Sequence, residues 1–308
     1  MAIPGGSLTG TSAISNLVQT AYDQYVRMAL RSIPVMRALA DVKPVQQAMP
    51  GSSVVFSIYS DLAQATSTLT ESLDVSSIAL GNPNQVTVTL QEYGSAVTTT
   101  KKLNQTSFND VDAALADIIA YNAADSIDAV VASVLTAGSN AIYAGTATNT
   151  SGIKADQLLT VSDIRQAVTE IRTNKALPRI GELYAGYLHP RQTADLRAET
   201  GTGGFQDLTK YVDRTPFVAG AVGVIEGAFI VETPRVPYAT NGTTNVYKAV
   251  IAGREALAEA QGQDISTVIG PQIDALRRFH TIGWYYFGGW SLLRQAAIYR
   301  VESAATNG

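Results

Sequence analysis

Apolar residues recur every three or four positions in two long stretches, which is the spacing of an amphipathic helix. The first, residues 14–29, predicts a helix that stops near Pro34. The second predicts a helix over residues 108–137, with Ser107 as its N-cap and Gly138 as its stop. At about 1.5 Å per residue that helix is roughly 45 Å long, whereas a compact chain of this length has a radius of gyration of about 19 Å. The pattern therefore predicts an elongated molecule built along a spine.

Alternating apolar and polar positions predict strands at residues 54–59, 86–90 and 96–100. The long segment between the first two is rich in Ser, Thr and Ala and has a turn signal at Gly81-Asn82-Pro83-Asn84. Loops beyond about 15 residues are usually binding elements, lids or disorder, and an isolated hairpin is marginally stable in water. We therefore expect a long two-stranded arm that is stabilised by lying on another chain.

The pattern becomes mixed α/β from residue 155 onward. A helix is predicted from near Ser162 to before Pro178, and a strand at 183–188 runs into His189-Pro190, where proline opens a further helix. Later strands are predicted at residues 228–232 and 246–252. An aromatic stretch follows at 279–290, and an alternating strand pattern comes last, at 297–302.

The composition excludes several classes of protein. Hydrophobic residues make up 46% of the 308 residues and charged residues 16%, against about 25% charged in ordinary soluble domains, which argues against extensive disorder. The absence of cysteine excludes disulfides, thiolate metal sites and a cysteine nucleophile. The N-terminus lacks the regions of a secretory signal. The most apolar run, residues 217–231, is interrupted by Glu226 and three glycines, so no membrane span is expected.

Charge is distributed unevenly along the chain. Residues 44–153 contain nine acids and two lysines, a net −7, so the remainder of a chain of net charge −4 carries +3. Identical subunits packed head to tail could set the acidic part of one against the basic part of the next. A solvated acidic face explains the same pattern equally well.

The sequence offers little catalytic chemistry. His189 and His280 lack metalloprotease spacing, and Gly201-Thr202-Gly203-Gly204 lacks the spacing of a dinucleotide or phosphate loop. Arg277-Arg278 is a weak nucleic-acid patch in a protein of pI about 5.3. A catalytic pair of carboxylates stays a possibility at this stage, because the members of such a pair come together only in the folded chain. We predict no catalytic residue, no metal site and no cofactor.

The order of predicted elements, together with four local stretches, resembles one known family. The stretches are YLHPRQ at 187–192, GVIEGAFIVET at 223–233, AGREAL at 252–257 and DALRRFHTIGW at 274–284. They resemble the major capsid proteins of tailed bacteriophages with the Hong Kong 97-like fold. The resemblance implies an α+β capsid fold with an N-terminal arm, an extended β-hairpin called the E-loop, a P-domain with a long spine helix, and an A-domain.

The resemblance also implies a division of the chain and a set of partners. The expected parts are the N-terminal arm at 1–45, the E-loop and flanking P-domain strands at 46–105 (E-loop about 55–100), the spine helix at 106–152, the A-domain at 153–263 and the return strands of both domains at 264–308. Hexamers and pentamers would close into an icosahedral shell around double-stranded DNA, without sequence-specific binding and without a membrane. Scaffolding protein, portal protein and, as an optional component, decoration protein would be partners. Assembly would take place in the cytoplasm of the host bacterium and yield the virion capsid.

Contacts between subunits are expected to pair acids of the arm region with arginines elsewhere. The candidate residues are Asp61, Glu71, Asp74, Glu92, Arg27, Arg31, Arg37, Arg277, Arg278 and Arg294.

Two departures from the best-known family member matter. The segment between Pro44 and Thr100 has no lysine, so we expect a shell without that member's lysine–asparagine cross-links. About fifty residues precede the arm, too few for a fused scaffolding segment, so a separate scaffolding protein is expected. A start at Met1 argues against trimming of a precursor.

Three other readings stay open at this stage. An encapsulin-like bacterial compartment would share the fold and enclose enzymes, whereas an α/β hydrolase or transferase with an unrecognised site would form a small oligomer. A tail-tube or surface-layer protein would form tubes or sheets. Electron microscopy and gel filtration separate these alternatives.

Overall fold

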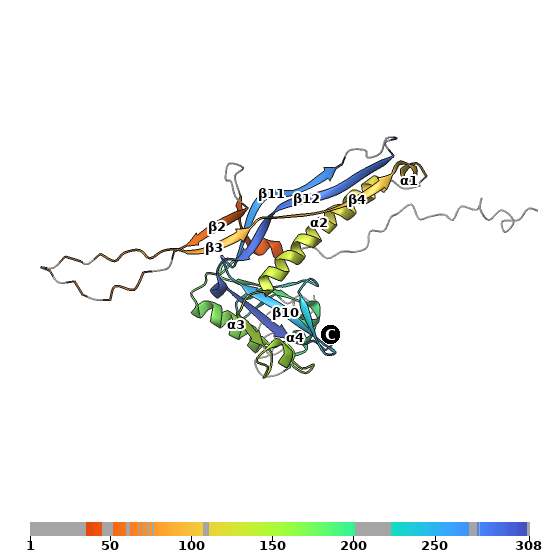
Figure 1. Cartoon of the computed structure of the whole chain (residues 1–308). Coiled ribbons are helices and arrows are strands. Elements are labelled where there is room, and N and C mark those ends of the chain that lie inside the picture. The colour runs from red at the N-terminus through yellow and green to blue at the C-terminus, as the bar shows by residue number, and fades with distance from the viewer. Residues whose placement is uncertain are drawn as a thin grey trace, which may run out of the picture.

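The computed structural model describes residues 35–44, 52–59, 62–106 except 67, 70, 73 and 76, 111–200, 223–270, 276 and 278–306. The predicted helix at 14–29, the N-cap at Ser107 and the glycine-rich stretch at 201–204 lie outside these residues. Two bodies, connected by a long helix, and one projecting ribbon make up the described chain (Figure 1).

The first body is built on a four-stranded sheet whose strand order is β1-β11-β12-β4. β1 runs parallel to β11, and the other neighbours are antiparallel. A long helix, α2, packs against β12 and β4 along one face of the sheet (Figure 1). The elements are η2 (Met36–Leu39), β1 (Ala40–Pro44), β4 (Gln91–Thr100), α1 (Lys101–Thr106), α2 (Val111–Thr136), β11 (Leu257–Ile269) and β12 (Phe279–Leu292).

Helix α2 confirms the predicted spine. Its 26 residues span about 39 Å, and one face buries Ile119, Ala123, Ile127, Val131 and Leu135 to 4% exposure or less. Within the described chain, Leu115–Thr136 is the one helical segment long and apolar enough to cross a membrane, with 39% of its most apolar window buried. Length and composition alone qualify this segment, and the core helix of a globular protein meets the same two criteria. Its contacts with strands of both bodies are those of a core helix.

The second body is built on a seven-stranded sheet of order β5-β13-β10-β6-β8-β7, with β9 pairing β10. Helix α3 packs against β13, β10 and β5, and a capping box between Thr160 and Asp163 starts it. The elements are β5 (Ala141–Tyr143), η3 (Thr150–Gly152), α3 (Val161–Thr173), β6 (Tyr184–Leu188), α4 (Pro190–Ala198), β7 (Val224–Ile225), β8 (Ala228–Glu232), β9 (Tyr238–Asn241), β10 (Thr244–Ala252), η4 (Gln295–Ala297) and β13 (Ile298–Ser303). The helices predicted near Ser162 and at Pro190 are confirmed.

Sheet pairing crosses two of the expected boundaries. The E-loop was expected at about 55–100, and β4 pairs along its length with β12 in the four-stranded sheet. The A-domain was expected at 153–263, and residue 263 lies inside β11, which belongs to the same four-stranded sheet. Both pairings join strands that are far apart in sequence.

The projecting ribbon, here called the arm, comprises residues 53–89. Its strands β2 (Ser53–Ile58) and β3 (Asn84–Thr89) pair antiparallel, and the described residues between them form no strand. Figure 1 shows this loop reaching away from both bodies. At its base, Val88 and Leu90 form a small apolar cluster with Ala258 and Ala260, separate from the main core. There Gly289 permits close crossing of the chains, because a Cβ would collide with the carbonyl oxygen of Thr89.

Candidate functional site

The loop of the arm presents large apolar side chains to solvent. Six of them are between 56% and 76% exposed: Tyr59, Leu62, Leu69, Val75, Ile78 and Leu80. Scattered exposed apolar side chains are ordinary on a protein surface, but a set gathered on one projecting segment indicates an interaction surface. The arm is therefore the first candidate for a functional region.

Acids of the arm region face solvent beside these apolar side chains. Glu71 is exposed, and the exposed Asp74 accepts a hydrogen bond from the Val75 N–H at 2.8 Å. Glu92 lies on β4, outside the arm, and is exposed. Asp61 lies outside the described residues. Glu71 and Asp74 are thus accessible to an external partner.

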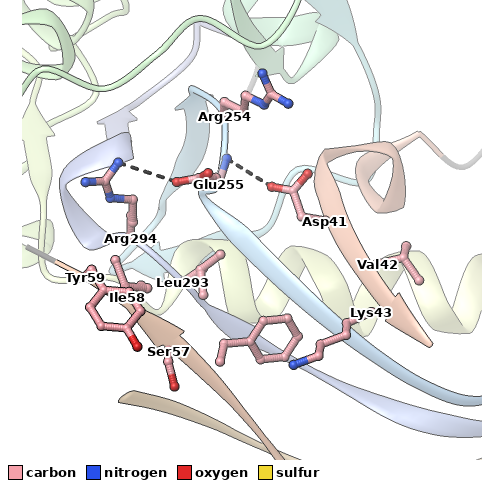
Figure 2. A pocket seen from close by; sticks show the side chains of 11 residues that line it. Asp41, Val42, Lys43, Ser57, Ile58, Tyr59, Arg254, Glu255, Leu293 and Arg294 are labelled. Carbon is pink, nitrogen blue, oxygen red and sulfur yellow. Dashed lines mark hydrogen bonds and ion pairs between the residues drawn. The ribbon is translucent and has the colours of Figure 1, made fainter. Parts of the chain in front are cut away.

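A cleft of about 610 Å³ lies where the arm meets the first body (Figure 2). Its lining comes from β1, from β2 and from the turns at 254–255 and 293–294. The backbone N–H of Glu255 donates to Asp41 at 3.0 Å, and Arg294 donates to the Glu255 carboxylate at 3.5 Å. On the opposite wall, the Lys43 ammonium lies 5.2 Å from the centre of the Phe56 ring. The cleft is a charged notch at the root of the arm.

The predicted arginines are placed differently from one another. Arg294 lies in the cleft, paired with Glu255. Arg278 is exposed, with its guanidinium 5.4 Å from the Phe279 ring centre. Arg27, Arg31 and Arg277 lie outside the described residues. The structure thus brings Arg294 to the base of the arm.

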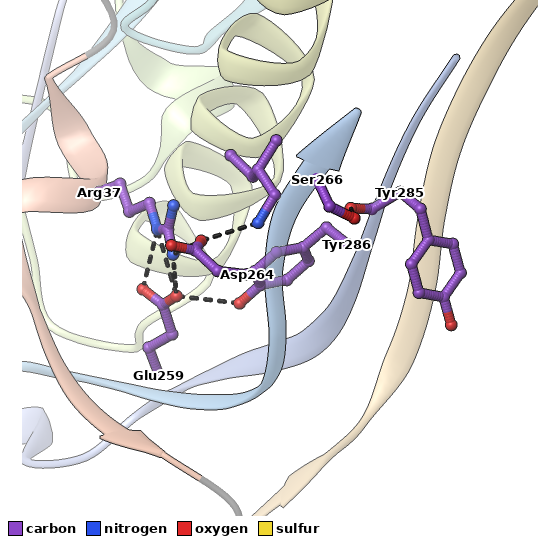
Figure 3. Close-up of polar contacts among 7 residues, drawn as sticks. Arg37, Glu259, Asp264, Ser266, Tyr285 and Tyr286 are labelled. Atoms are coloured by element: carbon purple, nitrogen blue, oxygen red, sulfur yellow. Dashed lines mark hydrogen bonds and ion pairs between the residues drawn. The ribbon is translucent and has the colours of Figure 1, made fainter. Parts of the chain in front are cut away.

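Arg37 points inward instead (Figure 3). Its guanidinium donates to the Glu259 carboxylate at 2.7 Å and to Asp264 at 3.2 Å. Glu259 is fully buried and also accepts from the Tyr286 hydroxyl at 2.9 Å. Burial opposes the charge of Arg37, but the hydrogen bond and charge of Glu259 outweigh it and raise the pKa of the guanidinium. Arg37 is therefore committed within its own subunit.

Sequence reasoning missed two arginines that link the bodies. Arg300 on β13 donates to the carbonyl oxygens of Thr136 and Gly138 at the end of α2 and pairs with the fully buried Glu302. A cation at a helix C-terminus is favourable for the helix dipole. Arg235 pairs with Asp125 of α2. The available signal was the pair of opposite charges at Arg300 and Glu302, two positions apart on one strand.

His189 has a structural position. Its Nδ1 accepts from the Arg191 N–H at 3.2 Å as the N-cap of α4, and its ring stacks on Tyr247 at 4.3 Å. Burial, and then the charge of Arg191, lower the pKa of the imidazole. This arrangement starts a helix.

Comparison with known proteins gives a consistent result. A family model described as phage capsid protein matches residues 12–297. The capsid of cyanophage P-SCSP1u is similar, at 17% identity and a TM-score of 0.73 over 94% of each chain. The capsid of cyanophage Pam1 has 14% identity and a TM-score of 0.73, covering 99% of this chain and 100% of that one. The capsid of Ralstonia phage GP4 has 13% identity and a TM-score of 0.70 over 98% of each chain. No curated protein matches.

Proposed function

Because this chain belongs to the phage capsid protein family, we propose that it is the major capsid protein whose copies form the icosahedral shell of a tailed bacteriophage. The expected α+β fold of the Hong Kong 97 type is confirmed by the capsid structures that the chain matches over almost its whole length. The observation that carries the assembly proposal is the arm, a marginal ribbon with large apolar side chains exposed at its tip. Neighbouring copies would cover those side chains.

The proposed parts follow the observed pairing. The arm at 53–89 is the E-loop, the four-stranded body with α2 is the P-domain, and the seven-stranded body is the A-domain. The arm lies across a neighbouring subunit, with Glu71 and Asp74 near basic residues of that neighbour. Candidates for those basic residues are Arg278 and Arg294, together with Arg27, Arg31 and Arg277.

We further propose a structural, non-catalytic role. We also propose a shell without covalent links between subunits, because the arm has no lysine. The shell encloses double-stranded DNA without reading its sequence; tight phosphate binding needs many basic contacts, and the chain has a net charge of −4. Scaffolding and portal proteins assist assembly in the host cytoplasm, and decoration protein is an optional addition. The finished protein resides in the virion.

Electron microscopy of particles made by the full-length protein, with a scaffolding protein if needed, tests the assembly proposal. Closed icosahedral shells are the expected result. A rigid monomer or small oligomer under all assembly conditions contradicts it. Nuclease-protected DNA in particles from infected cells distinguishes a virus from an enzyme-filled compartment. A single band on a denaturing gel is expected, and a ladder of linked subunits would refute the non-covalent shell.

A charge-reversal pair tests the arm contact separately. E71K/D74K is expected to reduce shell yield at least about tenfold, since a like charge across an interface costs several kcal/mol. The matched control is D156K/E182K, which reverses two exposed acids outside the arm. Equal yields from the two variants would contradict the arm contact and leave the capsid fold standing.

A further inference from the structure

The segment Val35–Asp41, here called the strap, contacts both bodies at once. Met36 and Leu39 are buried in the core, at 0% and 1% exposure. The strap then enters β1, which forms one edge of the four-stranded sheet by pairing parallel with β11. An edge strand is paired on one side only, so additional contacts decide how firmly it is held.

The first tie runs to the long helix. One carboxylate of α2, that of Asp128, accepts the backbone N–H groups of Val35 at 3.3 Å, Met36 at 2.7 Å and Arg37 at 3.2 Å. These groups lie at the start of η2, where backbone donors have no partner within their own turn. Asp128 is 1% exposed. A residue distant in sequence therefore caps the strap from inside the core.

The second tie runs to the seven-stranded body. The Tyr187 hydroxyl on β6 donates to the Val35 carbonyl at 3.2 Å. The Arg179 guanidinium donates to the Ala38 and Ala40 carbonyls at 3.1 and 3.2 Å and to the Asp41 carboxylate at 2.7 Å. Carbonyl groups of the strap are thus held by the seven-stranded body, and N–H groups of the strap are held by α2 of the four-stranded body.

The third tie is the ion pair between the half-buried Arg37 and the fully buried Glu259, and the Tyr286 hydroxyl is a further donor to that carboxylate (Figure 3). It fixes the strap to β11 and β12. Separating Arg37 from Glu259 would leave the buried carboxylate without its charge partner, which is costly.

We propose that the strap is a conformational coupler between the two bodies: its release from one body weakens its hold on the other. The physical basis is that the same short backbone satisfies polar groups of both bodies, so movement at Arg179 displaces the N–H groups that Asp128 accepts. The inference concerns a single subunit and does not depend on shell formation.

Hydrogen exchange of the full-length protein tests the coupling. The variant Arg179→Gln removes a contact of the seven-stranded body, yet it is expected to accelerate exchange of the Val35, Met36 and Arg37 amides, which bond to Asp128. Loss of hydrogen bonds to a charged group supports an acceleration of about tenfold or more. Exchange of these amides within about twofold of the parent would overturn the proposal.

The matched control is Asp125→Asn. It removes the ion pair between α2 and Arg235, which also links the two bodies but does not touch the strap, and it leaves the hydrogen bond from Arg235 to the Tyr121 hydroxyl of α2 in place. The strap amides are expected to keep their parent exchange rates in this variant. Equal acceleration in both variants would mean general loosening and would overturn the coupler. Arg179 is partly exposed, at 19% of its side chain, so its variant is expected to fold; unchanged exchange in β10 verifies this.

Discussion

The arm and the seven-stranded body contain the same kinds of apolar side chain, but the body buries them and the arm exposes them. In the body, the central strand β10 pairs with β13, β6 and β9, and its residues Val250, Ile251 and Ala252 are at most 1% exposed. In the arm, Leu69 is 76% exposed and Ile78 is 67% exposed. Residue type therefore does not decide burial here. What decides it is whether the topology supplies a second layer.

Polar groups repeat the contrast. Inside the body, the fully buried Gln192 donates to the Ser303 hydroxyl at 2.8 Å, because an unpaired buried amide is costly. In the arm, Glu71 and Asp74 remain in solvent. The body thus provides a partner for its polar side chain, whereas the arm leaves these two acids exposed to solvent.

The largest effect is expected where the body holds the long helix. Arg300→Met leaves the buried Glu302 without its charge partner, which costs about 3–5 kcal/mol in the free energy of unfolding. Urea unfolding of the unassembled subunit measures it. The double variant R300M/E302L is expected to recover most of the loss, because apolar replacement of a whole buried pair is often neutral. No recovery would mean that most of the loss comes from the hydrogen bonds between Arg300 and the carbonyl oxygens at the end of α2.

A matched pair of leucine truncations tests the contrast directly. Leu188→Ala in β6, where the side chain is fully buried, is expected to cost about 2–5 kcal/mol of unfolding free energy. Leu69→Ala on the arm is expected to change it by no more than about 0.5 kcal/mol, yet to lower the yield of shells. The comparison breaks if Leu69→Ala destabilises the unassembled subunit as much as Leu188→Ala does.

A matched pair of glycines separates the root of the arm from its exposed loop. Gly289→Ala places a Cβ against the Thr89 carbonyl and is expected to cost about 1–3 kcal/mol through overpacking. Gly81→Ala has open space around the new methyl group and is expected to stay within about 0.5 kcal/mol. Melting temperatures of the two variants decide the matter. Equal temperatures would show that the ribbon can shift away from the sheet without loss.

The smallest expected effect is a pH dependence inside the body. The lowered pKa of His189 means that the folded state favours neutral imidazole. The stability that neutral His189 adds to the folded state is therefore present above about pH 6.5 and is lost as the pH falls through the folded-state pKa. His189→Asn keeps an N-cap acceptor and removes the titration. When the pH is lowered from 7.5 to 5, the melting temperature of the parent protein is expected to fall further than that of the variant. Identical losses would assign the dependence to other groups.

Local elements were predictable, while pairing was not. The spine helix was predicted at 108–137 and is observed at Val111–Thr136, because helical periodicity is a local signal. The strand β11 was missed, since Glu259 and two register shifts near Gln263 break its alternation. Arg37 was a candidate for contacts between subunits, and within the subunit it pairs with Glu259, which lies far away in sequence. Only the packed fold brings these two charges together.

The capped end of α2 has a mechanical consequence. The helix is about 39 Å long and Arg300 of the seven-stranded body holds its C-terminal end, so a change of angle at this end would displace the opposite end the most. A tilt of about 5° at the held end displaces the opposite end by roughly 3 Å over this length. Subunits could thus meet their neighbours at different angles while the interior packing of either body changes very little.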